Sequence, residues 1–186
     1  MTDFSSWGYP LKESQSAIRP AWRPASIDTP PQESDLSTVL AFGNGRSYGD
    51  SCINRSGTVV DCRSMNRFIH FDSASGELTL DCGVLFSDII DTFLPKGWFL
   101  PVTPGTRFVT VGGAIANDVH GKNHHRRGTL GQHVIELQLL RSNGDLLTCS
   151  QSDNSDLFNA TIGGLGLTGL ITSATIQLVA VESAYP

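Results

Sequence analysis

Residues 104–125 read PGTRFVTVGGAIANDVHGKNHH, and this stretch interrupts the hydrophobic periodicity on both sides of it. Its small residues, up to Ala116, allow the backbone to approach a flat ligand closely. A helical turn that begins near Gly112 is expected to direct free N–H groups at an anion. The stretch therefore favours a ligand with a flat part and a charged part, as a nucleotide has.

Two further loops are rich in glycine, GNGRSYGD at 43–50 and GGLGLTG at 163–169. Glycines allow successive N–H groups to converge on one anion, and Arg46 can bind phosphate oxygens through two parallel hydrogen bonds. The first loop is not a Walker A motif, because no GKS or GKT follows it. Nor is it a dinucleotide GxGxxG motif, because Tyr48 stands where the third glycine is required. A sharp surface turn would explain one such loop alone. Three loops in one short chain favour a nucleotide site.

The composition excludes several classes of protein. The hydrophobic fraction of 39% is enough for a core, and 13 Lys and Arg against 18 Asp and Glu argue against a nucleic-acid module with a broad basic face. The four cysteines form no CxxC pair, which favours free thiols in a reducing compartment. No apolar stretch approaches the ~18 residues of a membrane span, and the N-terminus lacks a signal-peptide pattern. We expect a cytoplasmic chain and leave a peripheral contact with a membrane open.

Histidines and cations crowd a short interval between residues 120 and 133. His120, His124, His125 and His133 lie there with Lys122, Arg126 and Arg127. The spacing and the surplus of cations are poor for zinc, so no metal site is predicted. The interval is either a solvated basic loop or an electropositive mouth for an anionic substrate, with His120 able to donate to an electron-rich ring.

Hydrophobic patterns predict an α+β fold with mainly antiparallel strands. The first 36 residues carry five of the nine prolines and predict an irregular lead-in. Asn143-Gly144 predicts a hairpin between the strands that flank it. The expected strands lie at 38–42, 58–62, 68–72 and 78–82 (the last three as a small meander), at 134–140 and 146–149, and within 170–181; the expected helices lie at 85–94 and 155–160.

The three loops resemble the FAD-contacting segments of decaprenylphosphoryl-β-D-ribose 2-oxidases, a family within the vanillyl-alcohol-oxidase superfamily. The resemblance rests on GNGRSYGDS at 43–51, on residues 104–125 and on ATIGGLGLTGLI at 160–171. It implies an FAD-binding domain of the PCMH type over 37–186, with two α+β subdomains at about 37–102 and 103–186. It also implies a substrate domain that is absent from these residues, so that the chain would be a fragment or one half of a split enzyme.

The resemblance also implies which residues contact the cofactor and the substrate. Tyr48, His120 and Lys122 match residues that border the substrate cavity, and they are the catalytic candidates. Arg46 stands where relatives with covalently attached flavin commonly carry histidine, and a guanidinium cannot serve as that nucleophile, so the FAD is expected to be non-covalent. The implied FAD contacts are Ala41, Phe42, Gly43, Asn44, Gly45, Arg46, Ser47, Tyr48, Gly49, Asp50, Ser51, Gly105, Thr110, Val111, Gly112, Gly113, Asn117, Asp118, Val119, His120 and Ile171.

The implied activity is FAD-dependent oxidation of a CH–OH group of a sugar or polyol, with a polyprenyl-phosphate sugar as substrate in the complete enzyme and a role in cell-wall biosynthesis. The isolated chain would then be weakly active or inactive. Two alternatives stay open. One is a catalytically incomplete flavin-binding or interaction domain that needs a partner chain, and the other is a relative of the aldonolactone or alditol oxidases.

Overall fold

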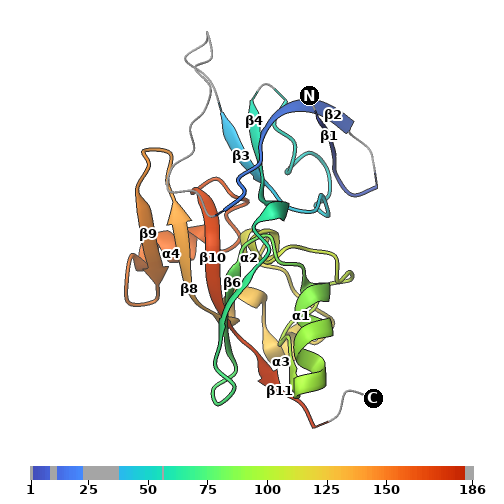
Figure 1. The fold of residues 1–186 in the computed structure, drawn as a ribbon, viewed down its shortest axis with the longest axis vertical. Helices are drawn as coiled ribbons and strands as arrows, with labels where there is room; N and C mark the ends of the chain where they lie inside the picture. The colour runs from blue at the N-terminus through green and yellow to red at the C-terminus, as the bar shows by residue number, and fades with distance from the viewer. Residues whose placement is uncertain (1, 9–11, 23–37, 56, 183–186) are drawn as a thin grey trace.

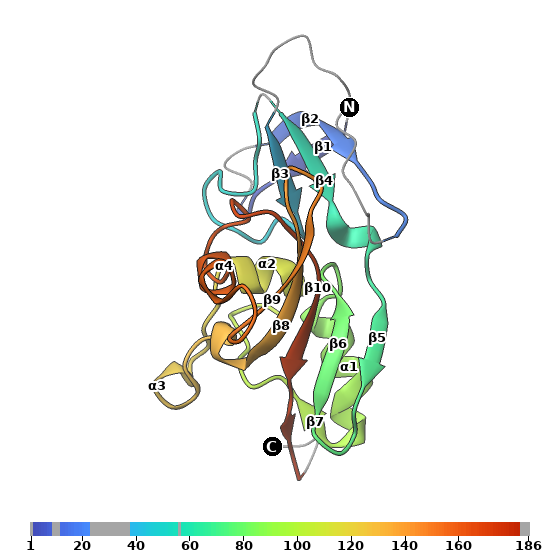
Figure 2. The ribbon, with the colours of Figure 1, turned by 90° about the vertical axis from the view of Figure 1, so that its left-hand side faces the viewer.

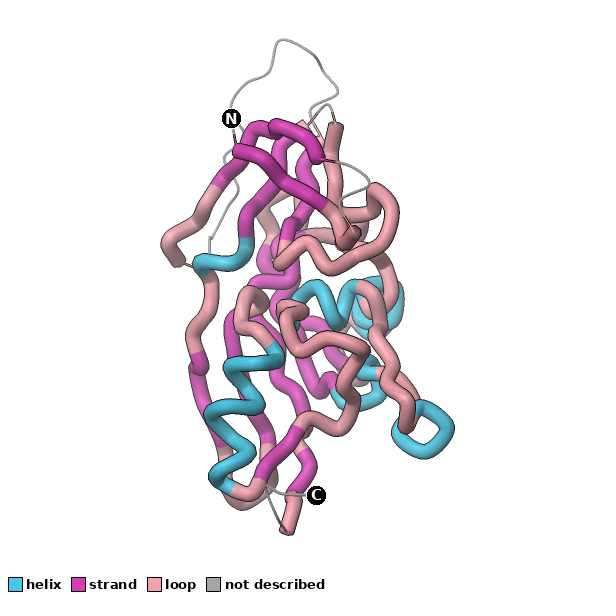
Figure 3. The backbone as a smooth tube through the Cα atoms, turned by 90° about the vertical axis from the view of Figure 1, so that its right-hand side faces the viewer, coloured by secondary structure: helices cyan, strands magenta, loops and turns pink. Residues whose placement is uncertain are grey.

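The computed structural model describes residues 2–8, 12–22, 38–55 and 57–182. These residues form a four-stranded, a five-stranded and a two-stranded sheet, with the four-stranded sheet at the top of Figure 1 and the five-stranded sheet below it. Figure 3 shows the helices as short segments on the flanks of strands that follow the long axis of the molecule. The arrangement confirms the predicted α+β class.

The four-stranded sheet has the order β1-β2-β4-β3 and is formed by Thr2–Ser5, Lys12–Ile18, Thr58–Asp61 and Val39–Phe42 respectively. Strands β2 and β3 both run parallel to β4, whereas β1 is antiparallel to β2. All four residues of β4 are buried. Phe4, Phe42 and Val59, from three of its strands, form a small apolar cluster with Cys52 and Ile53.

The predicted irregular lead-in is wrong for residues 2–5 and 12–18, which form β1 and β2. Their sequences, TDFS and KESQSAI, lack the alternation of apolar and polar residues that indicates a strand. Strand β2 nevertheless pairs with β4 from Ser16 to Ile18, and this tertiary pairing overrides the weak local signal. Residues 9–11 and 23–36 of the same prediction lie outside the described residues.

The five-stranded sheet has the order β5-β6-β10-β8-β9, and all its pairings are antiparallel. The hairpin of β8 and β9 confirms the prediction made from Asn143-Gly144, and Gly144 takes a φ of +90° in the connecting loop. The strands are β5 (Phe68–Phe71), β6 (Glu77–Asp81), β8 (Val134–Leu140), β9 (Leu146–Ser150) and β10 (Leu170–Gln177).

The predicted meander is wrong, because β4 belongs to the first sheet whereas β5 and β6 belong to the second. A short 3₁₀ turn, η1 (Cys62–Ser64), redirects the chain between them. The Asp61 carboxylate fixes this turn by accepting hydrogen bonds from the backbone N–H and the guanidinium of Arg63 and from the guanidinium of Arg19. The sheets also do not follow the predicted subdomain division near residue 102, since β5 and β6 complete the sheet that β8, β9 and β10 form.

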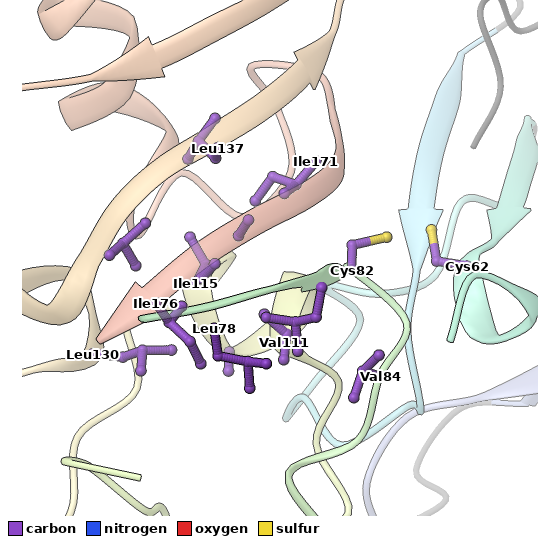
Figure 4. Packing of buried hydrophobic residues seen from close by; sticks show 14 of the residues in the cluster. Cys62, Leu78, Cys82, Val84, Val111, Ile115, Leu130, Leu137, Ile171 and Ile176 are labelled. Atoms are coloured by element: carbon purple, nitrogen blue, oxygen red, sulfur yellow. The ribbon is translucent and has the colours of Figure 1, made fainter. Parts of the chain in front are cut away.

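The helices flank the five-stranded sheet and close its core. The predicted helices appear as α1 (Phe86–Phe93) and α4 (Ser155–Thr161), and α2 (Val111–Ala116) begins beside the predicted Gly112. Helix α2 packs against β10, and α4 packs against β9 (Figure 2). Leu78, Ile115 and Leu137 are fully buried in this core (Figure 4). The remaining elements are η2 (Leu94–Lys96), β7 (Trp98–Phe99), α3 (His124–Arg127), η3 (Leu130–His133) and β11 (Val179–Ala180).

Candidate functional site

The three glycine-rich loops meet at one cavity of about 380 Å³. This volume lies within the range of about 300–1,000 Å³ that is typical of small-molecule and cofactor pockets. Residues 41–48 form one wall, residues 104–119 contribute a second, and residues 165–171 contribute a third. Segments that are more than 100 positions apart in sequence therefore build one site, as the sequence predicts.

Loop 43–49 leaves β3 and packs directly against the segment before α2. A Cβ added to Gly43 would overlap the Thr110 hydroxyl, so only glycine allows this close approach. The Asn44 side-chain amide donates a hydrogen bond of 2.8 Å to the carbonyl oxygen of Phe108. The first two loops thus support each other at the cavity wall.

The same loop presents polar donors to the cavity. Gly45 is buried with a φ of +61°, a conformation that helps neighbouring N–H groups to point the same way. Among the described residues, no group accepts a hydrogen bond from the backbone N–H groups of residues 44–47. The Nε of Arg46 is also buried without a hydrogen-bond partner in that part of the chain. A buried donor such as the Nε of Arg46 normally finds an acceptor, so this wall fits an anionic group of a ligand.

The beginning of α2 differs from the prediction. The backbone N–H groups of Val111 and Gly112 donate to the carbonyl oxygens of Val84 and Cys82, at 2.9 and 2.8 Å. The N–H of Gly113 donates to the Thr110 hydroxyl, which caps the helix at 3.2 Å. The expectation of free N–H groups at this turn is therefore wrong, because carbonyls from the link between β6 and α1 already satisfy them. The segment contributes small side chains and close packing to the cavity, and the free donors come from residues 44–47.

The third loop is held against the end of α2. The N–H of Leu165 donates to the carbonyl oxygen of Ala116 at 2.8 Å, and the N–H of Gly163 donates to that of Ile115 at 3.1 Å. Leu165 and Gly166, with φ values of +54° and +80°, turn the chain along the cavity wall. Ile171, the predicted cofactor contact of this loop, lies just beyond, at the start of β10, and lines the cavity.

The comparison with known families accounts for these features. Residues 33–150 match the family model of the FAD binding domain. The chain belongs to the FAD-binding-domain family. It is an FAD-binding domain of the vanillyl-alcohol-oxidase superfamily, and FAD is its cofactor, as the resemblance implies. The cavity between the three loops, with its unpaired donors at residues 44–47, fits the phosphate groups of that cofactor.

Relatives of this FAD-binding domain include several oxidoreductases. It is 49% identical over 149 residues to the decaprenylphosphoryl-beta-D-ribose oxidase of Mycolicibacterium smegmatis, covering 79% of this chain and 32% of that protein. It is 31% identical to the L-gulonolactone oxidase of Mus musculus (80% and 34% covered) and 34% identical to cytokinin dehydrogenase 3 of Arabidopsis thaliana (78% and 29% covered). The chain spans about a third of the length of these relatives.

Most of the predicted cofactor residues line the cavity of the FAD-binding domain, and six predicted site residues do not. Val111 is buried in the core, and the Asp118 carboxylate accepts a hydrogen bond of 2.8 Å from the backbone N–H of Gly131. Tyr48 lies at the rim, with 81% of its surface exposed. The lining residues are Ala41, Phe42, Gly43, Asn44, Gly45, Arg46, Ser47, Tyr48, Ser51, Gly105, Thr110, Gly112, Gly113, Asn117, Val119 and Ile171, and those outside the lining are Gly49, Asp50, Val111, Asp118, His120 and Lys122.

His120 and Lys122 lie on the exposed segment that leads from α2 to α3, which projects away from the sheets in Figure 2. The ring centroids of His120 and His124 are 5.7 Å apart, and His124 in turn contacts a backbone carbonyl. In the described part of the chain, no group of three or more His, Cys, Asp or Glu residues is placed to hold a metal ion. Nor does a helix of that part have the length and apolar character needed to cross a bilayer.

Sequence reasoning missed several residues of the site, of which the cysteines are the clearest case. Cys62 and Cys82 are buried free thiols, as expected, but both also line the cavity, and Figure 4 shows their sulfur atoms facing each other. The hydrogen bond with Cys62 and the burial of the thiol raise the pKa of Cys82 well above its ordinary value. The Cys82 thiol is therefore neutral at pH 7. The lining residues that were not named individually as cofactor contacts are Trp7, Cys52, Cys62, Cys82, Pro104, Thr106, Val109, Ala116, Leu165, Gly166, Gly169 and Leu170.

Proposed function

We propose that this FAD-binding domain holds the cofactor of an FAD-dependent oxidoreductase that oxidises a CH–OH group of a sugar, with a polyprenyl-phosphate sugar as the substrate class. The observation that carries the proposal is the 49% identity, over 79% of the chain, to a protein named for the oxidation of decaprenylphosphoryl-beta-D-ribose. The chain also has an FAD-binding domain whose three loops converge on one cavity.

Different residues of the chain are proposed to contact the cofactor and the substrate. Bound FAD supplies an acceptor for a hydride from a carbinol carbon. Arg46 and the backbone N–H groups of residues 44–47 would bind its phosphate groups, and the neutral thiol of Cys82 would line the cavity beside it. Tyr48, at the rim, is the proposed residue between cofactor and substrate. His120 and Lys122 are exposed and are proposed to bind the anionic part of the substrate.

The remaining substrate contacts are proposed to come from a further domain or a partner chain, because these residues span about a third of their relatives. A cytoplasmic location, with peripheral access to a membrane-held polyprenyl substrate, belongs to the same proposal and is tested by cell fractionation. The FAD is proposed to be non-covalent, since Arg46 offers no nucleophile. Acid precipitation should leave the flavin in the supernatant, and a yellow pellet would overturn this point.

Substrate-dependent reduction of the flavin tests the proposed activity. The FAD-loaded protein is mixed without oxygen with a polyprenyl-phosphoryl ribose, alone and together with the C-terminal part of a relative as a separate chain. Loss of flavin absorbance near 450 nm, dependent on the sugar, is expected at least in the combined sample. If no polyprenyl-phosphoryl sugar reduces the flavin in either sample, the proposed substrate class is wrong.

A second candidate is oxidation of an aldonolactone, which is favoured by the 31% identity to an L-gulonolactone oxidase over 80% of the chain. The same assay with L-gulono-1,4-lactone separates the two. Faster reduction by the lactone than by the polyprenyl-phosphoryl sugar would select this second function.

A further inference from the structure

Trp7 lies outside residues 33–150, which match the FAD-binding family, yet its side chain lines the cofactor cavity. The guanidinium carbon of Arg46 lies 5.3 Å from the centroid of the Trp7 ring. We propose that Trp7 is a positioning residue of the cofactor site, which holds the Arg46 guanidinium at the cavity wall so that this cation can pair with a phosphate group of FAD. The inference rests on FAD as the ligand and extends its site to the turn that follows β1.

The segment that carries Trp7 is fixed to the loop of Arg46 through Trp7 and Ser5. The backbone N–H of Trp7 donates a hydrogen bond of 3.0 Å to the carbonyl oxygen of Ser47. The carbonyl oxygen of Ser5 lies so close to Gly45 that a Cβ there would overlap it. The segment itself is anchored by Phe4, whose buried ring packs edge-on against Phe42 with 4.7 Å between centroids. Trp7 is therefore held beside Arg46 by the fold.

The contact leaves the hydrogen-bonding edge of Arg46 available. A guanidinium interacts with an aromatic ring through its face, and its N–H groups point outward in the plane. The Nε of Arg46 is buried and has no hydrogen-bond partner in the described part of the chain. Ordering a long side chain costs conformational entropy, and a cation that is already held when the ligand arrives lowers this cost at binding. The Trp7 contact thus prepares Arg46 for an anion.

A second contact between a tryptophan and an arginine provides the control, because it shows what the loss of such a contact does away from the cofactor cavity. The Trp22 ring contacts the guanidinium of Arg67, whose carbon lies 3.3 Å from the ring centroid. Trp22 is 61% exposed against 45% for Trp7, and neither Trp22 nor Arg67 lines the cofactor cavity. Removal of Trp22 therefore removes a similar contact at a place where it cannot affect Arg46.

The test is a double-mutant cycle on FAD affinity. Apoprotein is titrated with FAD, and Kd is followed by quenching of flavin fluorescence for the wild type, Trp7→Ala, Arg46→Ala and the double variant. Trp7→Ala is expected to raise Kd about three- to thirty-fold, the range that a cation–π contact supplies. In the Arg46→Ala background the same change should raise Kd less than about twofold, because its effect acts through Arg46. Trp7→Phe should recover most of the affinity, and Trp22→Ala should leave it unchanged.

Two results would overturn the inference. If Trp7→Ala raises Kd equally with and without Arg46, Trp7 is only part of the wall; if it does not change Kd, Trp7 has no role at the site. The melting temperature of each apoprotein is the folding control. If Trp7→Ala unfolds, Trp7→Leu replaces it in the cycle, because leucine keeps an apolar side chain but has no aromatic ring. A wild type that does not bind FAD would instead refute the proposed function itself.

Discussion

Gly45 and Gly49 share a backbone conformation but differ in their surroundings, and alanine at each position tests how loop 43–49 is held. Their φ values are +61° and +62°. A Cβ on Gly49 would meet nothing within 4 Å. A Cβ on Gly45 would overlap the Ser5 carbonyl oxygen and lie 3.2 Å from the Cζ of Phe42. Both substitutions share the conformational cost, but only Gly45→Ala has to move the N-terminal strand.

The magnitudes follow from these two terms. Gly49→Ala should lower the free energy of unfolding by about 1–2 kcal/mol, the cost of an L side chain in the left-handed region. Gly45→Ala adds backbone strain of about 1–3 kcal/mol as the Ser5 carbonyl is displaced, which gives a total of about 2–5 kcal/mol. It should also raise the Kd for FAD about tenfold or more, equal to about 1.4 kcal/mol, because the shift moves the unpaired N–H groups of the loop. Gly49 does not line the cavity, so its variant should bind FAD normally.

Urea unfolding of the apoproteins, followed by circular dichroism, gives the stability difference if the slope with denaturant is the same for both variants. Flavin fluorescence gives the two dissociation constants under the same conditions. Equal losses of stability at the two positions would refute the packing of loop 43–49 on Ser5. An unchanged Kd for Gly45→Ala would refute the role of this loop in holding the cofactor.

Three further predictions concern other parts of the site and its support. Thr110→Val removes the hydroxyl that caps α2 and should cost about 1 kcal/mol in urea unfolding; an unchanged midpoint would show that the cap is dispensable. Burial alone raises the pKa of Asp61, but hydrogen bonds from two arginines outweigh it and lower the pKa below its ordinary value of 3.8. The stability that this carboxylate contributes is thus present above about pH 4 and is lost as the pH falls through the lowered pKa. In Asp61→Asn the free energy of unfolding should therefore fall less steeply with decreasing pH below about pH 4. An unchanged dependence in this pH range would contradict the role of Asp61. The four buried thiols should react slowly with Ellman's reagent in the folded protein at pH 7 and quickly in guanidinium. Bound FAD should slow the reaction of Cys82 further. Rapid labelling of the folded protein would show that reagent enters the cavity wall freely.

The glycine-rich loops and the elements of the second half of the chain could be predicted because their signals are local. Asn143-Gly144 sets its own hairpin, and the glycines around Arg46 mark their loop by composition alone, although Gly43 and Gly45 approach the distant residues Thr110 and Ser5. Strands β1 and β2 could not be predicted, since their stability comes from β4 and from the buried ring of Phe4 rather than from their own pattern.

The same distinction applies within the candidate site. The position of a helical turn near Gly112 was predictable from its small residues, but the use of its N–H groups was not, because the accepting carbonyls of Val84 and Cys82 come from a distant segment. Trp7 could not be assigned to the cavity for the same reason, as it reaches Arg46 through the packing of a strand with no local signal.

The central claim is that this chain holds FAD in the cavity between its three loops, with an anionic group of the cofactor at Arg46. Titration of the apoprotein with FAD, followed by flavin fluorescence, tests it most directly when wild type and Arg46→Glu are compared. Saturable binding of one FAD per chain is predicted for the wild type, together with a large loss of affinity in Arg46→Glu while its melting temperature is retained. Absence of quenching by the wild type at tens of micromolar, or equal affinity in the two proteins, would contradict the claim.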